Sequence, residues 1–133
     1  MSEQRALGIK LELEPNPEGD NNFDINIKDG RASLTYLASK IKNGWLNNAG
    51  DVVLFFEDCI ASKFIASEPN VNIYPGWSEL ESDFGEIESS QWLASFPEHC
   101  NSYHHYFFAL NHNFFECIAK SFYTELHSEN KDR

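Results

Sequence analysis

The amino-acid sequence predicts an α+β fold, in which a single domain has a mainly antiparallel β-sheet and one or two short helices. Apolar and polar residues alternate at 7–14 and 23–28, as they do in strands with one wet face. An unbroken apolar run occupies 52–56, and 103–110 is rich in aromatic residues. One segment, 33–43, has helical spacing instead. The length of 133 residues suits one domain with one core.

The N-terminal third is expected to begin with a β-hairpin. The first alternating segment, 7–14, ends at a stretch dense in turn formers, 15–22, and the second, 23–28, follows directly. Two such segments around turn residues are typical of paired antiparallel strands. The apolar face of the first strand would carry Leu7, Ile9, Leu11 and Leu13.

The segment 33–43 is expected to form a short amphipathic helix. Ser33 suits an N-cap and Gly44 a C-terminal stop. The apolar residues between them follow i, i+3, i+4, i+7 spacing, at Leu34, Leu37, Ala38 and Ile41.

The rest of the chain is expected to add strands and one helical turn. Val52–Phe56 suits a central strand covered on both faces, and 62–66 and 70–74 suit short strands. Residues 89–96 fit one or two helical turns that end at Pro97. The segment 103–110 is strand-like, whereas 114–126 fits either a helix or the second strand of a closing hairpin; the hairpin is favoured. Residues 1–133 would then form one domain, with a disordered tail at 128–133.

Charge is the most informative bulk property. The chain has 21 acidic and 10 basic residues, a formal net charge of −11. Direct binding to nucleic acid or to an anionic membrane is therefore disfavoured. Between Lys63 and Lys120 there is no Lys or Arg.

The acidic segment Trp77–Glu88 is the candidate interface. Five acids alternate there with apolar residues, which is also what an ordinary amphipathic segment with a solvated face would show. The absence of neighbouring bases favours a contact surface for a basic protein, where carboxylates speed association and an aromatic residue anchors it. The predicted partner-binding residues are Trp77, Glu79, Glu81, Asp83, Glu86 and Glu88.

No motif indicates catalysis, a metal or a cofactor. The glycines form no phosphate-binding pattern, and neither HExxH nor GxSxG is present. The histidines cluster around 99–112, but His104 and His105 would point to opposite faces of a strand. A small enzyme or metal-binding protein that uses His104, His105, His112 and Cys117 stays open as an alternative.

The cysteines and the N-terminus favour a cytoplasmic protein. Cys59, Cys100 and Cys117 are odd in number and form no CxxC pair, which is typical of reduced thiols. No apolar run is long enough to cross a bilayer, and the first residues do not form a signal peptide.

Three stretches resemble a group of small bacterial proteins, some of which are immunity partners of secreted or contact-delivered toxins. They are Val53–Phe64, Ile87–Leu93 and Tyr103–Ala119. In that group a strand ends in Phe-Glu-Asp, a Ser-x-Trp-Leu turn follows and a β-hairpin closes the chain, and the order is the same here. The resemblance favours the closing hairpin, and it implies a protein that neutralises a toxin, often a basic nuclease, by stoichiometric binding.

The function expected from the sequence is therefore that of a non-enzymatic immunity protein, with a monomer favoured and no cofactor. Its partner would be a cognate toxin domain, a basic protein. The first alternative is an acidic nucleic-acid mimic that inhibits nucleases or DNA-binding proteins, and it would use the same acidic surface.

Overall fold

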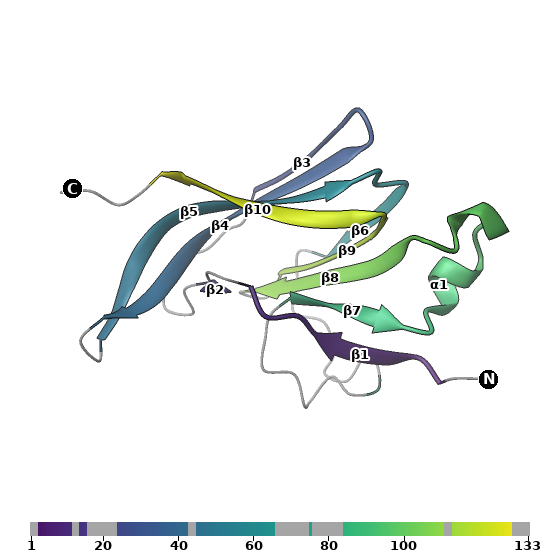
Figure 1. Cartoon of the computed structure of the whole chain (residues 1–133), viewed down its shortest axis with the longest axis horizontal. Helices are drawn as coiled ribbons and strands as arrows, with labels where there is room; N and C mark the ends of the chain where they lie inside the picture. The colour runs from purple at the N-terminus through teal and green to yellow at the C-terminus, as the bar shows by residue number, and fades with distance from the viewer. Residues whose placement is uncertain are drawn as a thin grey trace.

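The computed structural model describes most of the chain as two antiparallel β-sheets with one helical turn (Figure 1). The residues that it describes are 3–11, 14–15, 24–42, 45–65, 75, 84–110 and 113–128. No helix within these ranges is long and apolar enough to cross a membrane.

The first sheet, here called sheet A, is built from five strands that neighbour one another in an order unlike their order along the chain. Every pairing in it is antiparallel. Across the sheet the strands are β1 (Arg5–Gly8), β7 (Phe84–Glu88), β8 (His104–Leu110), β9 (Asn113–Ala119) and β6 (Ala61–Ile65).

The second sheet, sheet B, is centred on the long hairpin of β4 and β5. β10 pairs with the free side of β5, and β2 and β3 pair with different parts of β4. The bounds are β2 (Glu14–Pro15), β3 (Asp24–Lys28), β4 (Arg31–Lys42), β5 (Trp45–Glu57) and β10 (Ser121–Ser128).

The last two strands, β9 and β10, join the two sheets. Only Lys120 separates β9 in sheet A from β10 in sheet B, and its N–H donates to the Glu57 carbonyl oxygen at 2.9 Å. The chain thus turns from one sheet to the other at a single residue, which holds the sheets face to face at this corner.

The main core lies between the sheets and is rich in aromatic rings. Phe56 from sheet B is fully buried, with its ring centroid 5.5 Å from Tyr106 and 5.8 Å from Phe115 of sheet A. Such tilted ring pairs add stability beyond the area that they bury. The other buried members of this core are Leu11, Ala32, Leu34, Tyr36, Ala38, Val52, Leu54, Phe84, Phe108, Cys117 and Ala119.

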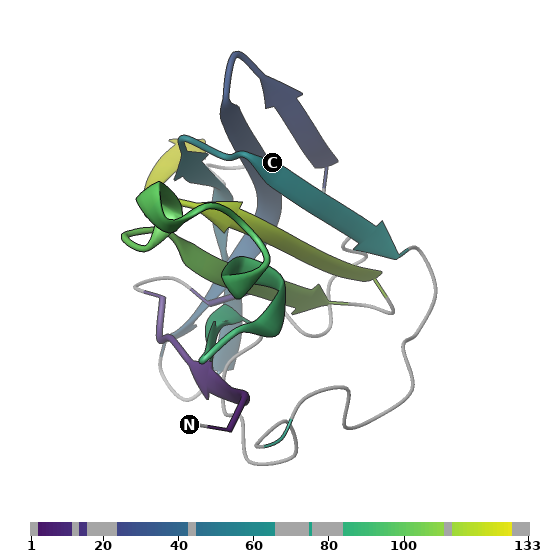
Figure 2. The same cartoon turned by 90° about the vertical axis from the view of Figure 1, so that its right-hand side faces the viewer.

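The outer face of sheet A is also covered. Ala6, Ile87, Phe107 and Phe114 form a second, smaller core there. The single helical turn α1 (Gln91–Ala94) lies over this face against β8 (Figure 2), and a 3-10 turn, Glu98–Cys100, follows it. Because both faces are covered, the segment 114–119 is buried without interruption.

The helix predicted at 33–43 is wrong, because residues 33–42 belong to strand β4. Leu34, Tyr36 and Ala38 are buried, and Ser33, Thr35 and Leu37 between them are only half-buried. Burial thus alternates with a period of two, as in a strand. The pairing of β4 with β3 on one side and with β5 on the other outweighs the helical spacing of Leu34, Leu37, Ala38 and Ile41. The antiparallel sheet is confirmed, but the α+β class is not, because the described residues contain only one short helix and one 3-10 turn and are mainly β.

The predicted pairing of 7–14 with 23–28 is also wrong. β1 ends at Gly8 and pairs with β7, whereas β3 pairs with β4. The turn between β3 and β4 is Asp29-Gly30, and both residues have positive φ, 53° and 73°. Asp-Gly is the preferred sequence for such a two-residue hairpin turn, so a local signal for the true pairing was present.

The other strand predictions agree with the structure where its residues are described. Val52–Phe56 lies within β5, between β4 and β10, and the strand at 62–66 appears as β6. The closing hairpin is confirmed as β8 and β9, and 114–126 is strand rather than helix. The strand predicted at 70–74 lies outside the described residues, as do residues 129–133 of the predicted tail.

Phe56→Ala is expected to lower the free energy of unfolding by about 3 to 5 kcal/mol, because it empties a fully buried site among three aromatic rings. Urea denaturation followed by far-UV circular dichroism measures this. The matched control is Phe55→Ala, one residue earlier on the half-buried outer face of sheet B, which should cost clearly less. Equal losses for the two variants would show that the core has been misplaced.

Candidate functional site

The predicted partner-binding segment is described only at its C-terminal end. Trp77, Glu79, Glu81 and Asp83 lie outside the described residues. Glu86 and Glu88 lie on β7 in sheet A. The structure therefore places two of the six predicted residues.

Glu86 and Glu88 differ in their surroundings. The Glu86 carboxylate contacts His104 on β8, with 2.6 Å between Oε2 and Nδ1. Both side chains of this pair are partly exposed. Glu88 is exposed at the end of β7, opposite Arg5 of β1 in the sheet register. Arg5 therefore compensates part of the local charge.

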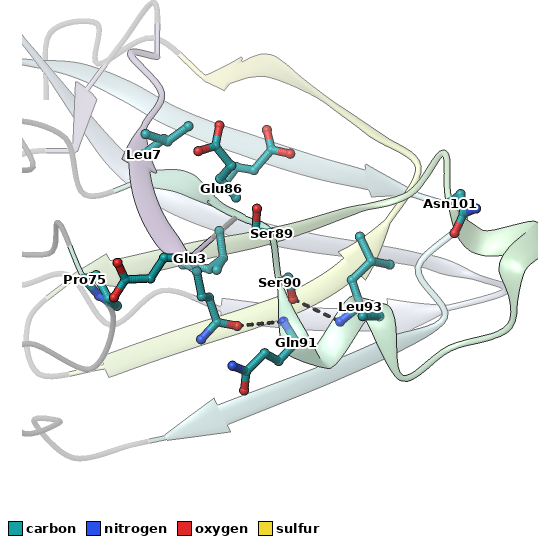
Figure 3. A pocket seen from close by; sticks show the side chains of 13 residues that line it. Glu3, Leu7, Pro75, Glu86, Ser89, Ser90, Gln91, Leu93 and Asn101 are labelled. Carbon is teal, nitrogen blue, oxygen red and sulfur yellow. Dashed lines mark hydrogen bonds between the residues drawn. The ribbon is translucent and has the colours of Figure 1, made fainter. Parts of the chain in front are cut away.

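A cleft of about 910 Å³ opens beside this end of β7. Its walls come from the N-terminal segment, β7 and α1, and Figure 3 shows the side chains that line it. The acidic members are Glu3, Glu86 and Glu88, and none of the described residues that line it is Lys or Arg. The other residues are Gln4, Leu7, Pro75, Ile87, Ser89, Ser90, Gln91, Leu93, Ala94 and Asn101.

The helical turn that forms one wall begins at Ser90. Ser89 before it has a φ of 55°, which turns the chain sharply from β7 into α1. The Leu93 N–H donates to Ser90 Oγ at 3.0 Å, so Ser90 is the N-cap. The Gln91 N–H donates to Gln4 Oε1 at 2.7 Å, which ties the N-terminal segment to the same turn (Figure 3).

Beneath this turn lies a buried polar network that sequence reasoning missed. Ser90 Oγ is 2.7 Å from His105 Nδ1, and His105 Nε2 is 2.7 Å from Glu116 Oε1. Ser90, His105 and Glu116 are 6%, 1% and 5% exposed. Ser90 Oγ accepts the Leu93 N–H and also bonds to His105 Nδ1, and His105 Nε2–H donates to Glu116 because a carboxylate oxygen accepts.

The same three residue types form the triad of many hydrolases, so the geometry needs comparison with that chemistry. In the triad the serine bonds to Nε2 and the carboxylate to Nδ1, and here the two nitrogens are exchanged. The rings of Trp92 and His105 pack edge to face with centroids 5.1 Å apart, and Lys63 Nζ lies 4.0 Å from the centroid of the Trp92 ring. The Gln91 N–H next to Ser90 is bonded to Gln4. This enclosed arrangement suits anchoring of α1 better than attack on a substrate.

The histidines and Cys117 of the alternative site are not brought together in the described residues. His104 and His105 face opposite sides of sheet A, as strand alternation predicts, and His112 lies outside the described residues. Cys117 is buried in the main core. Within the described ranges no three His, Cys, Asp or Glu residues are grouped so as to hold a metal ion.

A signal for the buried network was present in the sequence. Glu116 is the one charged residue in the apolar run 114–119, and a charge at a buried position requires a partner. His105 is the obvious partner only after β8 and β9 are known to pair, because the bond crosses the sheet diagonally from His105 to Glu116.

Comparison with known proteins finds no matching family model, no matching curated protein and no matching solved structure. The resemblance to immunity proteins thus depends on the three motifs alone. In the fold these motifs meet, because Ser90 and Trp92 of the second motif contact His105 of the third.

His105→Leu is expected to cost about 3 to 5 kcal/mol in the free energy of unfolding, because it leaves the Glu116 carboxylate buried without this partner. The matched control is His104→Leu, which removes a partly exposed contact with Glu86 and should cost about 0 to 1 kcal/mol. Urea denaturation of both variants measures the difference.

A double variant separates lost pairing from lost packing. His105→Leu with Glu116→Leu removes the buried charge as well as its partner, so it should be more stable than His105→Leu alone. If Glu116→Leu instead lowers the free energy of unfolding of the His105→Leu variant further, the burial of the Glu116 carboxylate does not depend on His105.

Proposed function

We propose that this chain is a binding protein that neutralises a basic protein partner, and that the acidic cleft beside β7 forms part of its contact surface. The observation that carries the proposal is the composition of the cleft. Three carboxylates and several apolar side chains line it, and no basic side chain does so among the described residues.

A lysine or arginine side chain of a partner fits the chemistry of this cleft. The carboxylates of Glu3 and Glu88 are exposed, and charge-assisted hydrogen bonds to them would be stronger than neutral ones. Leu7 and Leu93 would contact the alkyl part of such a side chain. An arginine is favoured over a lysine, because its planar guanidinium can bond to two carboxylate oxygens at once.

The charge of the whole chain supports the same kind of partner. A formal net charge of −11 attracts basic proteins over a distance of about 8 Å at physiological salt. Such attraction raises the association rate more than it lengthens the life of the complex. The same charge disfavours direct contact with nucleic acid.

The narrower proposal is an immunity protein that blocks a cognate bacterial toxin in the cytoplasm, without catalysis of its own. It is supported by the resemblance of Val53–Phe64, Ile87–Leu93 and Tyr103–Ala119 to proteins of that kind. It requires a stoichiometric complex with one toxin. A nucleic-acid mimic would instead bind several unrelated basic nucleases with comparable affinity.

The direct test uses the toxin domain encoded by the neighbouring reading frame. Calorimetry is expected to show a one-to-one complex with this domain and no binding to a panel of unrelated basic nucleases. Comparable binding across the panel would favour the mimic, and no binding to any of them would overturn the proposal.

Charge reversal locates the contact surface. Glu3→Lys with Glu88→Lys should slow association with the toxin domain by about tenfold and weaken its salt dependence, because both changes oppose long-range attraction. The matched control is Glu125→Lys with Asp51→Lys, two exposed acids on β10 and β5 in sheet B, which changes the net charge by the same amount. Stopped-flow fluorescence at several salt concentrations measures the rates, and equal slowing by the control would show that only net charge matters.

The segment before β7 has its own test. Reversal of Glu79, Glu81 and Asp83 to Lys should slow association, whereas Trp77→Ala should speed dissociation by a factor that corresponds to about 2 kcal/mol or more if Trp77 is an anchor. If these variants leave both rates and the protection of cells unchanged, the interface lies outside Trp77–Asp83.

A further inference from the structure

The edge of sheet B at β10 differs from the other sheet edges in the described part of the chain. β10, yellow in Figure 1, ends the strand order of sheet B and pairs with β5 alone among the described strands. Alternate residues of such an edge strand direct their N–H and C=O groups away from the sheet. These groups are a template for one more strand, so natural edges are short or carry proline or charged side chains.

The other edge strands have this protection. β1 spans four residues, and its Ala6 N–H donates to the Pro75 carbonyl oxygen at 2.7 Å. β6 spans five residues with Lys63 at its centre, β3 spans five and ends at Lys28, and β2 contains Pro15. β10 spans eight residues, Ser-Phe-Tyr-Thr-Glu-Leu-His-Ser, without proline, lysine or arginine. It is therefore the longest and least protected edge.

Sheet A extends beyond β10 on this side. Phe122 of β10 packs against Phe84 of β7 with ring centroids 4.9 Å apart, and against Tyr106 of β8 at 5.4 Å. Phe56 on the neighbouring β5 also reaches Phe115 of β9. A step outward across sheet B is thus a step from β9 towards β7 in sheet A, and a strand added to β10 would lie opposite β7 and β1.

The side chains that this added strand would meet are acidic and apolar. Leu7 of β1 and Glu86 of β7 are register partners, so they lie on the same face of sheet A. This is the inner face, because Phe84 of the main core lies two residues before Glu86 on β7. Leu7 is 40% exposed, and both residues also line the acidic cleft. The added strand would therefore border the cleft.

We propose that an extended, basic segment of the partner pairs with the free edge of β10 as an added β-strand. The proposal rests on the proposed function, because the partner is the same basic protein. Main-chain hydrogen bonds along β10 supply the pairing, and alternate side chains supply the specificity. Inward lysine or arginine side chains complement Glu86, and apolar ones cover Leu7 and the 46% exposed Leu126.

A second copy of the chain fits this edge less well. Two chains that each have a formal net charge of −11 repel each other. Moreover, β10 of a second copy would bring Glu125 and no lysine or arginine towards Glu86. The charge of the edge and of the sheet beside it therefore favours a basic segment.

The test measures amide hydrogen exchange of the protein alone and with two capped synthetic peptides of about eight residues. One peptide alternates lysine with valine, and the other alternates glutamate with valine. The lysine peptide is expected to slow the exchange of alternate amides in 121–126, and the glutamate peptide to bind at least about tenfold more weakly. The same amides should be protected in the complex with the toxin domain.

Matched variants locate the contact. Leu126→Lys gives β10 the kind of charge that protects the other edges, so it should weaken binding of the lysine peptide by about tenfold. The control is Ile27→Lys, which makes the same change of charge at a 52% exposed residue of β3 and should alter the affinity less than about twofold. Equal weakening by both variants would overturn the proposal, because only net charge would then matter.

The outcomes separate this proposal from the proposed function. If the toxin domain binds while 121–126 exchange as in the free protein, the added strand is contradicted and the binding function stands. If no toxin domain binds, the lysine peptide decides alone, and unchanged exchange at 121–126 overturns the proposal. A dimer that sedimentation detects, with the same amides protected, would make a second copy the occupant and would overturn it too.

Discussion

The Glu116 carboxylate is buried on the outer face of sheet A, and the arrangement around it follows from the need to give that charge a partner. His105 on the adjacent strand donates to Glu116, and Ser90 bonds to the other nitrogen of the same ring. Ser90 in turn accepts the Leu93 N–H and so fixes the start of α1. A helical turn of four residues is too short to be stable alone, so this network and the contact of Trp92 with His105 hold it in place. Because α1 forms one wall of the acidic cleft, the shape of the proposed binding site depends on a bond formed beneath it.

The two faces of sheet A differ in what they pack against. The inner face packs aromatic rings against sheet B, and a loss there affects the whole fold. The outer face combines a small apolar core with the polar network, whereas Glu86 and Glu88 alternate with the buried Ile87 and lie on the opposite face, where β7 pairs with β1. Gly85 allows this layer to close, because a Cβ at that position would overlap the Leu7 carbonyl oxygen and the Phe107 ring.

The sequence predicted those parts of the fold that depend on local pattern. The strand at Val52–Phe56 follows from an unbroken apolar run, whereas the closing hairpin was favoured by the resemblance, because the spacing in 114–126 also fits a helix. The segment 33–43 misled because its apolar residues satisfy both a period of 3.6 and a period of two, and only the neighbouring strands decide between them. The site was predictable in part, because the acidic residues Glu86 and Glu88 stand out in the sequence. The cleft is also lined by Glu3 and Gln4, which lie more than eighty residues away in the sequence. These two residues reach β7 and α1 only because β1 pairs with β7.

Backbone amide hydrogen exchange at Leu93 tests the central claim most directly, because that N–H donates to the buried Ser90 hydroxyl oxygen. If the network holds α1 on sheet A, the Leu93 amide of the wild-type protein exchanges as slowly as the amides of β8, and His105→Leu makes it fast while the amides of β5 stay protected. If the Leu93 amide of the wild-type protein already exchanges as fast as a solvent-exposed amide, α1 is not anchored by Ser90, His105 and Glu116, and the account of the cleft built on it is contradicted.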